Sequence, residues 1–494
     1  MSRKNLQNIK LKNSILKTKP FFNQEGFVAG IPPFLRGPYS TMYIQKPWVT
    51  RHFSGFSTAE DSNYFYREQL KKGQTELSIL FDNATNKGYD SDHKNVQEVI
   101  GKKGVAIDSV EDIKVLFYKI PLDKISVFIK TDINFLPILA FYIAAAEEQN
   151  INTSDLSLTI ESNILKNSNL YSASIITDVF EYSSKNKLDF NYSISDYSSL
   201  ETVNNPEKTL AFSLTEGLEF LRKAIEAGIN IDDIAPKLSY SWSINMNHFA
   251  EIAKIRAARM LWAKMVKQFD AKNSESFILK SHCKTSDSSL TQQDPFNNIT
   301  RVTTEAMAAI FGGTQSLHTN ALDETFALPS EVSAQVAKDT QIYLQKETNI
   351  TQTVDPWAGS YHLENLTEDL ANKAWKLICK IEESGGISNF FENGTPKTET
   401  KNTNNDTKIG VNKYQLEKED PLTFLEIDGK AVQDLQIKKL DKLKPIRNNL
   451  AVKESLNNIS KAIKHQKGNL LELTIIAAKY RATLEEISNA LLKE

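Results

Sequence analysis

The feature that most constrains the fold is an alternation of short apolar segments with amphipathic helical patterns between about residues 60 and 380. Eight of these segments have the length and composition of strands, and a helical pattern follows each of them. The predicted strands are 77–82, 104–108, 125–130, 156–162, 190–195, 238–244, 277–282 and 314–320. Strands that alternate with helices pair in parallel, so the sequence predicts an α/β fold, a (β/α)8 TIM barrel.

Three of the predicted strands carry small polar side chains on one face and apolar side chains on the other, because alternate residues of a strand point to opposite faces. The polar faces are Ser157, Thr159 and Glu161; Asn191, Ser193 and Ser195; and Ser239, Ser241 and Ser243. Barrel strands are normally apolar on both faces. The pattern therefore favours an open interior lined by hydroxyl groups, which suits a long, flexible, polar ligand. The alternative is an antiparallel sheet with one solvated face, which the helix after each strand disfavours.

The composition changes towards both ends of the chain. Residues 1–26 form a basic N-terminal arm, which we expect to be disordered, with a transit peptide as the alternative. Residues 27–389 hold the barrel, 390–410 form a polar linker rich in Thr, Asn and Lys, and 411–494 form a helical C-terminal extension.

Charge and cysteine content exclude several classes of protein. Lys and Arg number 59 against 61 Asp and Glu, so no global charge points to nucleic acid or to a membrane surface. No apolar run approaches the roughly 20 residues of a membrane span. Cys283 and Cys379 lie far apart without a CxxC pattern, which fits a reducing cytoplasm and excludes a cysteine-rich metal site.

Barrel enzymes place their catalytic groups at the carboxyl ends of the strands. The titratable or amide candidates there are Asp82, Asp108, Lys130, Glu161, Asp196, His282, His318 and Asn320. They show no metal-ligand or paired-carboxylate spacing, and the chain has no GxSxG motif, P-loop or dinucleotide-binding loop. These absences disfavour a metal hydrolase and a glycosidase, and we predict no metal ligand among them. His282 and His318 have no evident carboxylate to orient them, so we expect both to be hydrogen-bonded lining residues.

The aromatic and basic segment 39–53 has two open interpretations. It is either an edge segment packed on the barrel or a cationic, stacking clamp for the end of a nucleotide.

From about residue 28 to the C-terminus, the chain resembles the large-chain barrel of methylmalonyl-CoA mutase, in the adenosylcobalamin-dependent acyl-CoA mutase family. The segments that carry this resemblance include "GIPPFLRGPYSTMY", "FDNATNKGYDSDH", "GVAIDSVEDIKVLF", "GGTQSLHTNALDE" and "GVNKYQLE". The resemblance implies a barrel at 27–389 that binds the pantetheine chain of coenzyme A along its axis. It also implies a separate adenosylcobalamin-binding domain with a DxHxxG motif.

The resemblance assigns site residues in two groups. Positions that match contacts to the acyl-CoA substrate are Tyr39, Thr41, Met42, Lys46, Arg51, Ser78, Thr159, Glu161, Lys237, Ser239 and His282. Positions that match residues facing the cofactor are Phe81, Gln315, Asn320, Glu324 and Ala327.

Several matched positions depart from the family pattern. Lysine replaces arginine at Lys46, Lys237 and Lys280, which keeps the charge and loses the bidentate geometry. Phe53 replaces a tyrosine, and Glu161 replaces a glutamine near the thioester carbonyl. Lys284 and Asp287 replace a glutamine and a glycine beside the adenosyl pocket.

Two losses affect the expected reaction more strongly. The family has an arginine for the substrate carboxylate and a histidine beside the thioester carbonyl. This chain has no arginine between Arg67 and Arg222 and no histidine between His93 and His248; "DYSSLETVNNP" stands where the histidine is expected. Loss of one such electrostatic group costs on the order of 10²–10³ in rate. The 494 residues also contain no DxHxxG motif.

These features lead to three hypotheses. The first is a non-catalytic barrel chain, a pseudoenzyme that forms a heterodimer with a full-length or cobalamin-binding mutase subunit. The second is an active acyl-CoA mutase subunit of the isobutyryl-CoA type that uses a separate cobalamin-binding chain. The third is an acyl-CoA binding protein without catalysis. We favour the first, with adenosylcobalamin bound by the partner chain or not at all.

Overall fold

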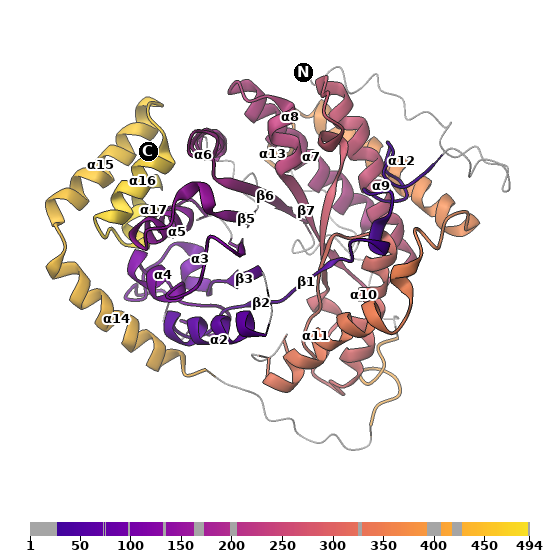
Figure 1. The fold of residues 1–494 in the computed structure, drawn as a ribbon, viewed down its shortest axis with the longest axis horizontal. Helices are drawn as coiled ribbons and strands as arrows, with labels where there is room; N and C mark the ends of the chain where they lie inside the picture. The colour runs from indigo at the N-terminus through magenta and orange to yellow at the C-terminus, as the bar shows by residue number, and fades with distance from the viewer. Residues whose placement is uncertain are drawn as a thin grey trace. The chain divides into compact units, whose positions relative to one another are not determined.

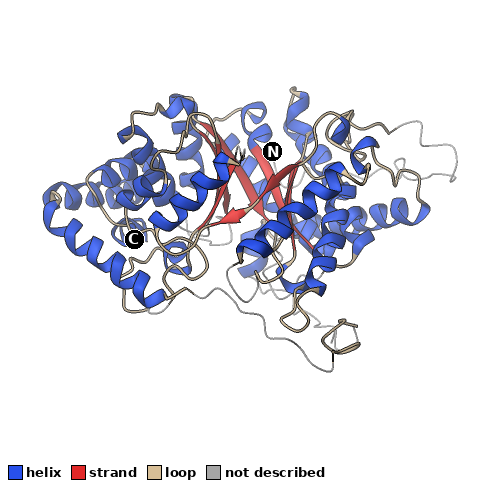
Figure 2. Cartoon of the chain, turned by 60° about the horizontal axis from the view of Figure 1, so that its bottom comes forward, coloured by secondary structure: helices blue, strands red, loops and turns tan. Residues whose placement is uncertain are grey.

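The computed structural model describes residues 27–72, 74, 76–96, 99–131, 135–162, 172–197, 205–324, 329–392, 407–416 and 427–492. Its nine strands form one sheet in the order β1-β9-β8-β7-β6-β5-β4-β3-β2. The strands at the two ends of this order, β1 (Val49–Arg51) and β2 (Phe53–Ser54), are consecutive in the chain and separated only by His52. Helices follow most of the strands along the chain. Figure 2 shows the helices in blue and the strands in red. The fold is a parallel α/β barrel with C-terminal helices, as the sequence predicted.

The chain divides into two compact units. Unit 1 comprises Met1–Arg51 and Ile194–Leu425, and unit 2 comprises His52–Ser193 and Glu426–Glu494. Strand β6 (Asp189–Ser195) crosses the boundary between them.

The strands of unit 2 are β2, β3 (Glu76–Leu80), β4 (Ser126–Lys130) and β5 (Ser157–Ser162), which pair in parallel. Their helices are α2 (Ala59–Lys71), α3 (Asn83–Lys87), α4 (Val110–Leu116), α5 (Phe135–Glu148), α6 (Ser172–Asn186), α14 (Gly429–Ile446), α15 (Asn449–His465), α16 (Leu470–Lys479) and α17 (Leu484–Leu492), with a 3-10 turn at η4 (Thr153–Asp155).

Helix α5 explains why the C-terminal helices belong to this unit. Its sequence, "FLPILAFYIAAAEE", is apolar on all sides, and its residues from Phe135 to Ala146 are buried. A helix that is apolar all round must be covered on all sides. Within unit 2, α5 packs against α4, α16 and α17, and the yellow C-terminal helices lie beside it in Figure 1.

The strands of unit 1 are β1, β7 (Leu238–Ile244), β8 (Lys280–Thr285) and β9 (Ser316–His318). Its α-helices are α7 (Pro206–Glu226), α8 (Ile231–Ile234), α9 (His248–Val266), α10 (Asn297–Gly312), α11 (Glu331–Lys346), α12 (Tyr361–Glu383) and α13 (Ile387–Glu392). Its 3-10 turns are η3 (Met42–Ile44), η6 (Ala235–Lys237), η7 (Lys267–Phe269), η8 (Ser274–Phe277), η9 (Asp287–Ser289) and η10 (Ile350–Gln352).

The predicted strand at 104–108 is wrong. Val105 makes only an isolated bridge to Phe81. Gly101 and Gly104 have positive φ angles of 69° and 137°, and a capping box at Ser109 begins α4 immediately afterwards. Segment 104–108 is thus a tight connection rather than a strand.

The strands that the prediction missed are β1 and β2, which both begin within the aromatic and basic segment 39–53. Several other strand boundaries also differ, most clearly those of β8 and β9. Because Ser274–Phe277 form a 3-10 turn, β8 begins at Lys280 rather than at 277, and β9 is limited to Ser316–His318.

Among the helices in the described ranges, none combines the length and the apolar character of a membrane span. The arm at 1–26 and most of the linker at 390–410 lie outside the described residues. The domain boundaries at 26, 389 and 410 therefore stay predictions.

Candidate functional site

Unit 2 presents one polar strand face built from rows of side chains in register. Phe53, Ser78, Phe128 and Thr159 are successive partners across β2, β3, β4 and β5. Residues two positions further along a strand share its face. The next row towards the carboxyl ends is Leu80, Lys130 and Glu161. The predicted site residues Ser78, Thr159 and Glu161 therefore lie on the same face.

The opposite face of these strands is apolar and fully buried. Its residues Leu77, Ile79, Val127, Ile129, Leu158 and Ile160 are each at most 1% exposed. This difference confirms the division into two faces that the alternation of β5 predicted.

An ion pair lies at the carboxyl end of the polar face of unit 2. The Nζ of Lys130 donates to Oε1 of Glu161 at 2.6 Å, and the Glu161 side chain is only 1% exposed while that of Lys130 is 40% exposed. The same Nζ lies 5.9 Å from the centre of the Phe53 ring, which makes an edge contact with Phe128 at 5.5 Å. A buried carboxylate needs such a partner, because burying an unpaired charge is costly.

Unit 1 has a comparable polar face. Ser241, His282, Ser316 and Val49 form one row across β7, β8, β9 and β1. The next row towards the carboxyl ends is Ser243, Lys284, His318 and Arg51, and the row before it pairs Ser239 with Lys280. Of the predicted site residues, Arg51, Ser239 and His282 lie on this face. Nδ1 of the buried His282 lies 2.8 Å from Oγ of Ser316.

A charged cluster lies at the carboxyl ends of β8 and β9. Lys284 pairs with Asp287 at 3.0 Å and lies 3.9 Å from Glu324, and Nε2 of His318 lies 3.3 Å from the same Glu324 carboxylate. Nδ2 of Asn320 donates to Asp287 at 2.7 Å. The Glu324 carboxylate also accepts a hydrogen bond from the amide of Ala321.

The cluster determines the ionisation of Glu324. Burial alone raises the pKa of its carboxyl group, but His318, Lys284 and the Ala321 amide outweigh burial and lower the pKa to about 2. The expectation that His318 has no carboxylate to orient it is therefore wrong. Glu324 lies six residues later, and the turn after β9 brings it back to the imidazole.

The remaining predicted substrate contacts lie in the loops and turns of unit 1. Lys46 lies 5.9 Å above the Tyr39 ring, and Thr41 donates to Gln45. Met42 is buried in η3, and Lys237 ends η6 immediately before β7.

The predicted cofactor-facing residues are distributed over both units. Gln315 accepts from the Ser281 amide and donates to the Gly313 carbonyl in unit 1. Phe81 is buried in unit 2 and bridges to Val105. Ala327 lies outside the described residues.

Three acidic candidates at strand ends have structural roles. Asp82 caps α3 and accepts from the Gly101 amide, and Asp108 accepts from Ser91 and Gln436. Asp196 accepts from the Ser243 amide at 2.6 Å. These contacts hold loops in place and leave the polar faces as the candidate sites.

Lys130 and His318, which form ion pairs at the strand ends, are candidates by their position in the sequence but are not among the site residues that the resemblance assigns. No local motif marks either residue. The alternation of β4 and β5 is a further signal, because it places Lys130 beside Glu161 once the strands are aligned in parallel.

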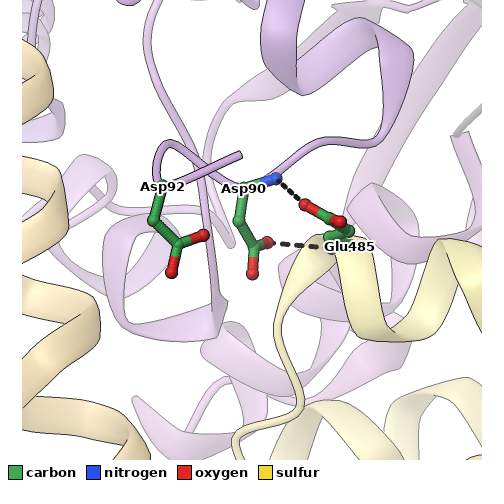
Figure 3. Close-up of side chains that lie close together, drawn as sticks. All are labelled: Asp90, Asp92 and Glu485. Atoms are coloured by element: carbon green, nitrogen blue, oxygen red, sulfur yellow. Dashed lines mark hydrogen bonds between the residues drawn. The ribbon is translucent and has the colours of Figure 1, made fainter. Parts of the chain in front are cut away.

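Three carboxylates, those of Asp90, Asp92 and Glu485, also gather in unit 2 (Figure 3). The amide of Asp90 donates to Glu485, and the amide of Glu485 donates back to Asp90. Asp92 is paired with Lys444 at 2.6 Å. These contacts join α17 to the 88–96 loop, so the arrangement is explained without a ligand.

Comparison with known proteins identifies the family. The family model described as methylmalonyl-CoA mutase matches residues 4–494. The methylmalonyl-CoA mutase large subunit of Porphyromonas gingivalis is 49% identical over 484 residues, which cover 94% of this chain and 68% of that protein. The Escherichia coli methylmalonyl-CoA mutase is 46% identical, covering 94% and 68%. The human mitochondrial methylmalonyl-CoA mutase is 45% identical, covering 94% and 65%.

The chain thus spans about two thirds of the length of these relatives. The family model matches nearly the whole chain, and these relatives are 45–49% identical to it. The chain belongs to the methylmalonyl-CoA mutase family.

Proposed function

We propose that this chain is the barrel subunit of an adenosylcobalamin-dependent methylmalonyl-CoA mutase-like complex, in which it binds acyl-CoA and does not catalyse the reaction on its own. Its proposed partner is a full-length or cobalamin-binding mutase subunit. Membership of the family and the two polar strand faces support acyl-CoA as the ligand, because hydroxyl groups suit the amide-rich pantetheine chain.

The observation that carries the non-catalytic assignment is the internal pairing of charges at the strand ends. Glu161, which stands where the family has a neutral amide, is paired with Lys130. Lys284 and Asp287, which stand where the family has a glutamine and a glycine, are paired with each other. Because the opposite charges in each pair neutralise each other, they stabilise a developing charge on a substrate less than preorganised hydrogen-bond donors without such a partner do.

The polar groups of the residues that face the cofactor by resemblance are mostly engaged within the fold, although Oδ1 of Asn320 is buried without a hydrogen-bond partner among the described residues. The polar side-chain groups of Gln315 are used in bonds to Ser281 and Gly313. Asn320 donates to Thr285 and Asp287, and Glu324 is bound by His318 and Ala321. We therefore assign the cofactor to the partner chain.

The test is co-expression of the tagged chain with a cobalamin-binding mutase subunit, followed by affinity purification and gel filtration. We expect a stable complex in which turnover requires the partner. Failure to form any complex contradicts the proposal. Turnover of isobutyryl-CoA that disappears when the site of this chain is altered favours the active-subunit alternative.

A further inference from the structure

We infer that the Lys130–Glu161 ion pair selects acyl-CoA ligands whose acyl group carries no carboxylate; this inference rests on the proposed function. The pair lies at the carboxyl ends of β4 and β5, where Lys130 and Glu161 are register partners. Ligands of parallel α/β barrels bind at this end of the strands. The pair therefore faces whatever part of the ligand reaches this strand end.

The pair has no net charge to offer to an anion. The Lys130 ammonium group is already neutralised by the Glu161 carboxylate at 2.6 Å. A carboxylate on the ligand would have to compete for the Lys130 ammonium group with Glu161, which is already in contact with it and whose side chain is 1% exposed. It would also be repelled by Glu161 itself, since like charges a few ångströms apart interact strongly away from bulk water.

The row next to the pair suits an apolar group. The rings of Phe53 and Phe128 lie on the same face, one row nearer the amino ends of the strands, and contact each other edge to face. Ser78 and Thr159 complete this row. An aromatic surface beside a compensated ion pair favours a short aliphatic acyl chain over a dicarboxylic one.

The experiment is isothermal titration of the full chain with free coenzyme A, butyryl-CoA and succinyl-CoA. We expect butyryl-CoA to bind at least ten-fold more tightly than succinyl-CoA. Glu161→Gln removes the negative charge beside Lys130 and with it the repulsion of a ligand carboxylate, so it should reduce this ratio at least ten-fold or reverse it. The double variant Lys130→Gln, Glu161→Gln removes both charges and should restore the preference for butyryl-CoA.

Asp123→Asn is the matched control, since it removes one negative charge from an exposed position of unit 2 just before β4 and should leave the ratio unchanged. Circular dichroism of each variant verifies folding. If the unaltered chain binds butyryl-CoA and succinyl-CoA with equal affinity, the inference is wrong. The inference is also wrong if the Glu161→Gln variant is folded and shows the same affinity ratio as the unaltered chain. Neither result contradicts the proposed function. Absence of binding to all three ligands, coenzyme A included, overturns acyl-CoA binding itself.

Discussion

Buried carboxyl groups in this chain are held in two different ways, one ionised and one neutral. Glu324 lies beside His318 and Lys284, which lower the pKa of its carboxyl group to about 2 and favour the charged form. Glu305, in α10, is fully buried and accepts a hydrogen bond from the Ser286 amide. Burial raises the pKa of Glu305 to about 8. The same side chain type therefore has opposite protonation states at neutral pH, depending on what lies beside it.

The pKa of Glu305 predicts a pH dependence of stability. Because the folded-state pKa lies above the unfolded value, the folded protein holds a proton that the unfolded chain releases between about pH 4.5 and 8. Stability should therefore fall as pH rises through this window, by about 1 kcal/mol per pH unit from this group. Glu305→Gln, which stays neutral, should show a flatter dependence.

Urea denaturation of both proteins at pH 5, 6.5 and 8 measures the difference. Other titrating groups, such as Asp90, whose pKa burial raises to about 7, contribute equally to both proteins and cancel. Identical slopes for the two proteins would show that Glu305 is ionised at neutral pH.

At the scale of elements, buried ion pairs hold the helices of unit 1 against one another. Arg222 in α7 binds Glu382 in α12 with two nitrogens and also reaches Glu219 within α7. Arg256 in α9 binds Asp355 and Glu364. These contacts fix how α7, α9 and α12 pack side by side, which apolar contacts alone specify less tightly.

Arg222→Met tests this linkage. It should lower the free energy of unfolding by about 3 kcal/mol, because it removes the cation that binds the buried Glu382 carboxylate through two nitrogens. Lys223→Met is the matched control, since the neighbouring Lys223–Glu226 pair is exposed and should contribute less than about 1 kcal/mol. Chemical denaturation gives both values, and equal effects of the two substitutions would contradict the assigned role of Arg222.

At the scale of the whole molecule, the chain has the barrel of the methylmalonyl-CoA mutase family. The charged side chains at the ends of its strands form ion pairs with one another. The expected consequence is that the barrel is retained for ligand and partner binding while the chemistry belongs to another chain. The polar faces remain, with Ser78, Thr159, Ser239 and His282 in register rows. On these faces Glu161 is paired with Lys130, and Lys284 is paired with Asp287.

The chain by itself should therefore show little mutase activity. With adenosylcobalamin and methylmalonyl-CoA, we expect its rate to be at least about 100-fold below that of the Escherichia coli relative, since the loss of one electrostatic stabiliser costs about 10²–10³. Formation of succinyl-CoA, followed by chromatography, measures both rates. A rate within ten-fold of the relative would refute the non-catalytic assignment.

The sequence by itself determined the barrel, the division of its strands into polar and apolar faces, and the family. These properties depend on local periodicity and on long matching segments, which need no knowledge of contacts. The same reasoning failed at 104–108, where an apolar segment that begins at Gly104 has the composition of a strand but makes only an isolated bridge, between Val105 and Phe81.

Only the tertiary structure decided which charges meet. Lys130 and Glu161 are 31 residues apart, and their contact depends on the register of β4 and β5. The Glu324 carboxylate reaches His318 and Lys284 because β8 and β9 end side by side and the chain then turns back. The sequence around a charged residue does not indicate which residue it pairs with in the folded protein. That partner decides whether the charged group is available to bind a ligand or already forms an ion pair within the fold.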